Sequence, residues 1–144
     1  GNSNAITPQL YTIDPLDFGK LTPRLGTCEI NYLTGTVTNI VNDICQSTKT
    51  SRGFYRIVGP KNTNMQVTVF THSNDGNGIM FTPNGKIKSS ELEVNITPGV
   101  MATLNSGPSG WVDVIIGGRL DLLLNLAPGT PYQPDFTISY DIEP

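Results

Sequence analysis

The sequence predicts an all-β protein, folded as an antiparallel β-sandwich. Only 15% of the residues are charged, while Gly 15 and Pro 11 are frequent, a composition that favours short strands joined by tight turns. Many short segments alternate apolar and polar residues, and none has the apolar period of a helix. At 144 residues the chain has the length of one domain with a single core.

The chain begins with an extended segment from Ile6 to Ile13, which Asp14-Pro15 interrupts because proline fixes φ and lacks an N–H donor. Both sides of this segment are apolar. Ile6, Pro8 and Leu10 lie on one side, and Tyr11 and Ile13 lie on the other. This pattern is typical of an edge strand pressed into a groove. We therefore divide the chain into an N-terminal segment, 1–15, and a sandwich domain, 16–144.

Alternation and turn residues indicate four further strands before residue 60. Leu16–Leu21 is short, and Thr27–Leu33 places Cys28, Ile30 and Tyr32 on one face. Thr34-Gly35 is a turn into a third strand, Thr36–Val41. A polar loop at 46–52 precedes Phe54–Val58, which Gly59-Pro60 ends.

The second half of the chain follows the same pattern. We expect Met65–Thr71 to neighbour Phe54–Val58 through a turn at 61–64. The later predicted strands are Ile79–Thr82, Leu92–Thr97, Trp111–Ile116, Arg119–Leu126 and Phe136–Ile142. Pro83-Asn84-Gly85 separates the first two of these, and Gly117-Gly118 separates the next pair. About nine or ten closely spaced strands favour a sandwich of the immunoglobulin-like type.

The final strand has the clearest pattern in the chain. Its apolar residues, Phe136, Ile138, Tyr140 and Ile142, alternate with Thr137, Ser139 and Asp141. This is the period of a strand with one buried and one solvated face.

The two cysteines, Cys28 and Cys45, favour a disulfide and an oxidising compartment. A bridge would close a loop of about 18 residues, which stabilises the fold by about 3 kcal/mol in the chain-entropy model. Two buried free thiols in a reduced protein are the alternative.

The composition argues against several partners. The net charge of -3 and pI of 4.9 provide no basic field for nucleic acid or an anionic membrane surface. No apolar run approaches the roughly 18 residues of a membrane-spanning segment.

No constellation of residues points to an enzyme, a metal or a cofactor. The single histidine, His72, lies in a polar turn, and Ser109 lacks the second glycine of a nucleophile elbow. Two cysteines and one histidine do not make a zinc site. The loop residues Asn74, Asp75 and Asn77 lack the glutamate of a calcium loop, and a hairpin turn is the preferred interpretation.

Three acidic residues, Glu91, Glu93 and Asp113, have the alternation of solvated strand positions, which argues against an acid/base pair. Trp111 is expected to pack at the core or at an edge. A sugar-stacking role would require this side chain to be exposed.

Three stretches carry a resemblance: Leu16–Leu21 (LDFGKL), Phe54–Gly59 (FYRIVG), and Gly118–Tyr140 with its APGTPY turn. Together they resemble a family of small secreted bacterial β-sandwich domains of unassigned function, which are similar to the pilins of chaperone-usher fimbriae. The resemblance implies an extracellular location, at the bacterial cell surface in a fimbrium. It also implies other copies or related subunits as partners, and a periplasmic chaperone.

In pilin-like subunits the sandwich lacks its last strand, and the N-terminal extension of another subunit fills the groove beside the C-terminal strand. The resemblance thus implies a donor in Ile6–Ile13 and an acceptor edge along Phe136–Ile142. Pilins often join their first two strands by a disulfide, whereas Cys28 follows the Asp17-Phe18-Gly19 segment here. The N-terminal segment is also short, so it could complete its own sheet. The chain would then be a self-contained secreted or cell-surface binding module, or adhesin.

Overall fold

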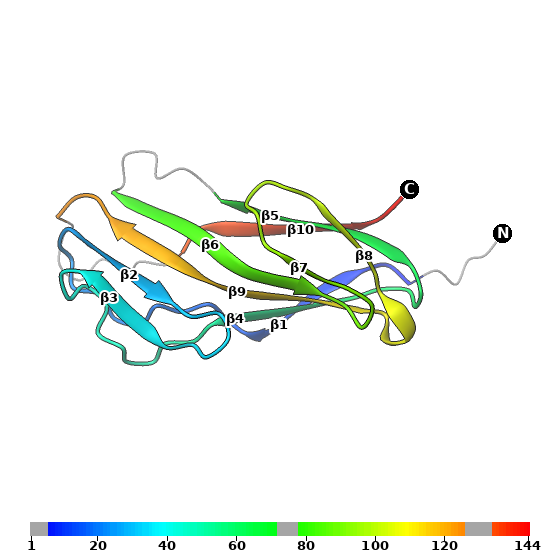
Figure 1. The fold of residues 1–144 in the computed structure, drawn as a ribbon, viewed down its shortest axis with the longest axis horizontal. Coiled ribbons are helices and arrows are strands. Elements are labelled where there is room, and N and C mark those ends of the chain that lie inside the picture. Colours follow the sequence, from blue (N-terminus) through cyan, green and yellow to red (C-terminus); the bar gives the residue numbers. More distant parts are fainter. Residues whose placement is uncertain (1–5, 72–77, 126–133) are drawn as a thin grey trace.

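A computed structural model describes residues 6–71, 78–125 and 134–144. These residues form ten strands and one 3₁₀ turn, arranged as two antiparallel sheets that pack as a sandwich (Figure 1). The prediction of an all-β sandwich is confirmed. The elements are β1 (Gln9–Asp14), β2 (Gly26–Ile30), β3 (Val37–Val41), β4 (Gly53–Val58), β5 (Asn64–Thr71), β6 (Ile79–Lys88), β7 (Glu93–Asn95), β8 (Ala102–Asn105), η1 (Gly107–Ser109), β9 (Trp111–Leu122) and β10 (Phe136–Ile142).

The larger sheet has seven strands and is built around β9. One edge of β9 pairs first with β4, over residues 111–116, and then with β2, over residues 118–122. Its other edge pairs with β6. Outside these strands, β1 pairs with β4, β3 with β2, and β7 with β6.

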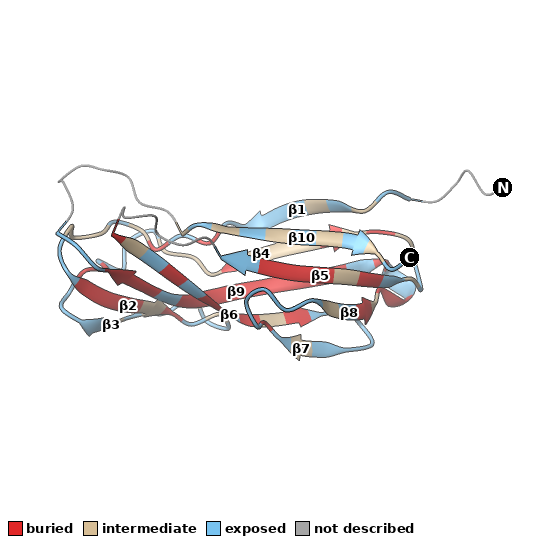
Figure 2. Ribbon diagram, turned by 90° about the horizontal axis from the view of Figure 1, so that it is seen from above, coloured by how far each residue is buried: buried red, intermediate tan, exposed pale blue. Residues whose placement is uncertain are grey.

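The smaller sheet has the order β10-β5-β8, and the core lies between the two sheets. Strand alternation explains which side chains enter the core, because every second residue points to the same face. From β9 these are Val112, Val114 and Ile116, all fully buried. From β5 they are Met65, Val67 and Val69 (Figure 2).

Two glycine-containing segments that were predicted to separate strands lie inside strands instead. β9 runs through Gly117-Gly118, and β6 runs through Pro83-Asn84-Gly85. Gly85 and Gly118 have φ values of 141° and 136°, and a Cβ at either would overlap a carbonyl oxygen of the opposite strand. Glycine therefore permits close backbone approach here. β7 pairs with β6 only from Lys86 onward, so at Pro83 the edge of β6 that faces away from β9 has no strand partner among the described residues. Proline is tolerated there because no N–H donor is needed on an unpaired edge.

The predicted strand Leu16–Leu21 is wrong. Only two isolated bridges form in this region, Asp17 with Ser51 and Leu21 with Cys45. The side chain of Asp17 accepts a hydrogen bond from the Gly19 N–H at 2.8 Å, and Gly19 has a φ of 73°, so the chain turns. Leu16 and Phe18 nevertheless enter the core, as their alternation indicates.

The predicted pairing of Phe54–Val58 with Met65–Thr71 is also wrong, because β4 and β5 belong to different sheets. The chain crosses between the sheets beside η1, where the Gly59 N–H bonds to Gly110 and the Asn62 N–H bonds to Gly107. Three predicted strands are shorter than expected: β2 ends at Ile30, β7 spans only Glu93–Asn95, and β9 ends at Leu122. β8 was not predicted.

Candidate functional site

The last strand, β10, lies at the edge of the smaller sheet. It pairs with β5 in unbroken register, from Phe136 opposite Thr71 to Ile142 opposite Met65. No described residue pairs with its second edge. Along residues 138–142, this edge therefore has no strand partner within the described ranges and can accept another strand.

The inward side chains of β10 are incompletely covered. Phe136, Ile138, Tyr140 and Ile142 are all half-buried, as the alternation of this strand predicts for its core face. The β5 partners of Ile138, Tyr140 and Ile142 are Val69, Val67 and Met65, which are at most 1% exposed, whereas Thr71 opposite Phe136 is exposed. Burial therefore falls sharply between two adjacent strands on the same face. We call the half-buried row of β10 and the open edge beside it the acceptor edge.

Phe136 anchors the acceptor edge to the larger sheet. Its ring lies 5.8 Å from the ring of Tyr55 in an edge-to-face arrangement and 6.0 Å from that of Phe81. Aromatic pairs in this geometry stabilise a fold beyond the area that they bury. The beginning of β10 is therefore fixed against the core.

The structure places the candidate donor on β4 of its own chain. In β1, Gln9 lies opposite Val58 and Thr12 opposite Tyr55, with a bulge between Thr12 and Asp14. Leu10 packs against the core and is the one residue of β1 that is not exposed. Pro8 is half-buried, whereas Ile6, Tyr11 and Ile13 are exposed by 53, 49 and 50%. Backbone pairing, more than side-chain burial, holds this strand.

The donor and acceptor residues belong to different sheets and do not pair with each other. Both strands run along the same side of the molecule (Figure 2). The N-terminal segment thus adds to a sheet of its own chain by pairing with β4, as the alternative interpretation expects. The second edge of β10 has no strand partner among the described residues.

The cysteines form a disulfide, Cys28–Cys45, with both side chains buried. The β2–β3 hairpin brings them together. The Asn39 side chain reinforces this approach, since its amide donates to the Cys45 carbonyl at 2.9 Å and its oxygen accepts from the Cys45 N–H at 3.0 Å. The bridge therefore fastens the chain after β3 to β2.

A second group of residues gathers on the outer face of the larger sheet, at neighbouring positions of β4 and β9. Arg56 donates two hydrogen bonds to Asp113, at 2.8 and 3.0 Å. Its guanidinium lies 3.8 Å from the ring centre of Trp111 and 5.4 Å from that of Phe54. The hydrogen bonding to Asp113 raises the pKa of Arg56, so the guanidinium stays charged.

This group was not predicted as a unit from the sequence. Asp113 was predicted to be solvated, and it does lie on the outer face, but it is buried at 9% exposure beside Arg56. β4 and β9 lie far apart in the chain, and nothing local to either strand indicates their register. Trp111 was expected to pack at the core or at an edge. Arg56 packs against one face of its ring, but the side chain is still 42% exposed.

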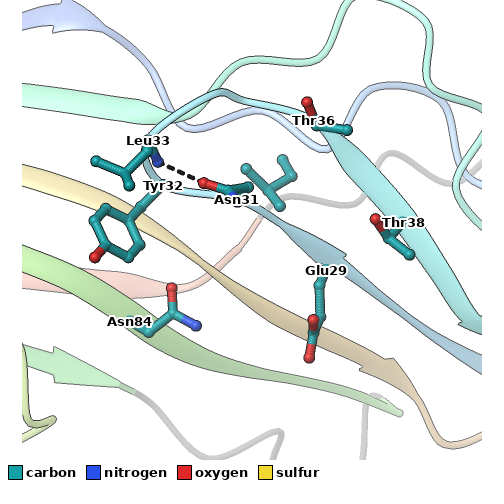
Figure 3. Close-up of a pocket in the computed structure, with 8 residues that line it drawn as sticks. Glu29, Asn31, Tyr32, Leu33, Thr36, Thr38 and Asn84 are labelled. Atoms are coloured by element: carbon teal, nitrogen blue, oxygen red, sulfur yellow. Dashed lines mark hydrogen bonds between the residues drawn. The ribbon is translucent and has the colours of Figure 1, made fainter.

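A polar hollow of about 370 Å³ lies at the tip of the β2–β3 hairpin, surrounded by side chains that include Glu29, Tyr32 and Asn84 (Figure 3). The oxygen of Asn31 accepts hydrogen bonds from the N–H groups of Leu33 and Thr34, at 2.8 and 3.3 Å. That amide therefore closes the turn. One carboxylate among neutral side chains gives this hollow no evident chemistry.

Two residue groups considered for chemistry, His72 and the loop residues Asn74, Asp75 and Asn77, lie outside the described residues. So does the predicted turn at 127–132. Ser109 lies in η1, where its hydroxyl accepts the Trp111 N–H at 3.1 Å. Within the described ranges, no three His, Cys, Asp or Glu side chains gather to hold a metal.

Comparison with known proteins identifies no relative of this chain. No protein-family model matches the sequence, and no curated protein or solved structure is detectably similar. None of the described segments is a helix long and apolar enough to cross a membrane.

Proposed function

We propose that this protein is a structural subunit of a bacterial surface filament that assembles by strand exchange. The N-terminal segment of one copy lies along the free edge of β10 in the next copy and completes its smaller sheet. One observation carries this proposal. Ile138, Tyr140 and Ile142 of β10 are half-buried, whereas their register partners on β5, Val69, Val67 and Met65, are fully buried.

An added strand would satisfy both needs of this edge. Its backbone would pair along the outer edge of β10 at residues 138–142, and its alternate side chains would cover the half-buried row. The spacing of Ile6, Pro8 and Leu10 suits that role, because residues two apart in a strand point to the same face. Proline at the third position of the segment is compatible with an edge strand, in which one N–H is not needed.

The donor can leave its own chain at modest cost. Its departure from β4 would uncover Leu10 and the adjacent edge of β4, but little else, since the remaining side chains of β1 are exposed already. The apolar surface of Ile6, which shares a face with Pro8 and Leu10 and is 53% exposed, would gain cover in a neighbour. The exchange therefore buries apolar surface that the single chain leaves in water.

The cellular setting follows from the same proposal. A buried disulfide favours an oxidising compartment, and the sequence motifs resemble secreted pilin-like domains. We place the protein outside the cell, in a fimbrium, with other copies of itself or related subunits as partners. An exposed apolar edge is an aggregation hazard before assembly, so a periplasmic chaperone would hold it.

The test is the assembly state of the purified full-length chain. We expect heat-resistant oligomers in size-exclusion chromatography and unheated gel electrophoresis. Ile138→Asp places a charge in the acceptor edge and should leave monomers, whereas Ser139→Asp on the opposite face of β10 should still assemble. A parent chain that remains a stable monomer at all concentrations would contradict the proposal, as would equal assembly of the two variants.

A further inference from the structure

A hollow of about 240 Å³ opens beside the exposed ring of Trp111, on the outer face of the larger sheet. It is lined by Trp111, Asp113, Lys88 and three serines, Ser89, Ser90 and Ser109. These residues come from the beginning of β9, the end of β6 with the turn after it, and η1. Neither β1 nor β10 contributes to it, so the hollow is separate from the proposed assembly surfaces.

The Trp111 ring is held in place on the side away from this hollow. Arg56 stacks on it at 3.8 Å but does not line the hollow, and Asp113 fixes Arg56 through two hydrogen bonds. The Trp111 backbone is fixed as well, because its N–H donates to the Ser109 hydroxyl. The hollow therefore has a flat, pre-positioned aromatic wall, which costs little entropy when a ligand binds.

The charges around the hollow do not cancel. Asp113 is neutralised by Arg56, while the ammonium group of Lys88, which lies opposite Asp113 in the β6–β9 ladder, has no ion pair or hydrogen bond with any described residue. Glu93 lies opposite Lys88 in the β6–β7 ladder but does not line the hollow. The hollow thus presents one free ammonium group beside serine hydroxyls.

We infer that this hollow binds a single carboxylated sugar residue, such as a hexuronic acid at the end of a glycan. The apolar face of a pyranose ring packs against the indole, and its hydroxyl groups bond to the serines. Its carboxylate accepts a charge-assisted hydrogen bond from Lys88. The volume of about 240 Å³ is below the roughly 300 Å³ of sites that enclose drug-sized ligands, so it suits one ring and not a chain.

The only tryptophan of the protein borders the site, so its fluorescence reports on binding directly. The full-length chain is titrated with a disaccharide ended by glucuronic acid, and with the same disaccharide ended by glucose. We expect a saturable change with the acidic sugar and affinity weaker by about tenfold for the neutral one, the effect of one charge-assisted hydrogen bond.

Three variants, checked for folding by circular dichroism, complete the test, with calorimetry as the readout. Trp111→Leu should abolish binding. Lys88→Gln should lower affinity for the acidic sugar by about tenfold, to that of the neutral one. Phe70→Ala, which removes a similarly exposed aromatic ring from the other sheet, should bind as the parent does.

The inference is overturned if neither sugar gives a saturable change, or if Trp111→Leu binds as the parent does. Equal affinity for both sugars in the parent also overturns it. These outcomes do not depend on whether the chain assembles into filaments.

Discussion

Tyr55 joins three parts of the molecule through one side chain. Its hydroxyl oxygen accepts a hydrogen bond from the Leu16 N–H at 2.9 Å, and its ring meets Phe136 edge to face. It therefore links β4 to the chain after β1 and to the first residue of β10. Burial of the phenol raises the pKa of Tyr55 above the ordinary value of 10.0, although the hydrogen bond from Leu16 opposes this shift.

The raised pKa makes Tyr55 a source of alkaline sensitivity. Its neutral form is favoured in the folded state, so its contribution is complete below the unfolded pKa and is lost as pH rises through the higher folded pKa. Near pH 8 we expect Tyr55→Phe to lower the free energy of unfolding by about 1 kcal/mol, through the lost hydrogen bond. Near pH 11 the difference from the parent should shrink or reverse. Urea unfolding at both pH values tests this, and an unchanged difference would contradict it.

Several residue-scale features could be predicted from the sequence because their causes are local. The pairing of Cys28 with Cys45 follows from an even cysteine count and a hairpin between them. The inward positions of β10 follow from its alternation. The Arg56–Asp113–Trp111 group could not be predicted in the same way, because it depends on the register between two distant strands.

At the scale of elements, β9 explains the largest errors of sequence interpretation. Gly117-Gly118 resembles a turn between two strands, yet β9 continues through it because β6 pairs with its other edge without a break from Asp113 to Leu122. The glycines instead mark the point where the partner changes from β4 to β2. Local sequence cannot distinguish a turn from such a change of partner, since glycine serves both.

The same pairing predicts an order of local stability that hydrogen exchange can measure. β9 is paired on both edges and its inward side chains are fully buried, whereas β1 pairs on one edge and is almost wholly exposed. If opening of β1 costs about 3 kcal/mol less than global unfolding, its amides exchange about a hundredfold faster than those of β9.

The matched control for this measurement is β3, which is also an exposed strand that pairs on one edge. The disulfide and the Asn39 hydrogen bonds hold the chain that follows it. We therefore expect β1 to exchange faster than β3. Protection of β1 equal to that of β9 would mean that the N-terminal strand is firmly held and would weaken its assignment as a donor.

At the scale of the whole molecule, the two sheets differ in completeness. The seven-stranded sheet has a central strand with partners on both edges, while the three-stranded sheet ends at β10 with its apolar row half-covered. The half-covered row of β10 leaves apolar surface in water, so the single chain is less stable than it would be with a further strand beside β10. Addition of a strand from a second copy is therefore expected to raise stability as well as to join the copies.

A reversible lock on β1 tests whether that strand is the donor. Gln9 and Val58 are direct partners in the β1–β4 ladder, and the Cα separation of such pairs, about 4.5–5.5 Å, is within the range that a disulfide spans. The double variant Gln9→Cys/Val58→Cys should, when oxidised, hold β1 on its own chain and remain monomeric in size-exclusion chromatography. Mild reduction should restore assembly, because the native disulfide is buried and the introduced one lies on the outer face.

The single variant Gln9→Cys, kept reduced, should assemble like the parent. If the oxidised double variant assembles as fully as the parent, residues 9–13 are not the exchanged strand, and the free edge of β10 is filled by a different segment.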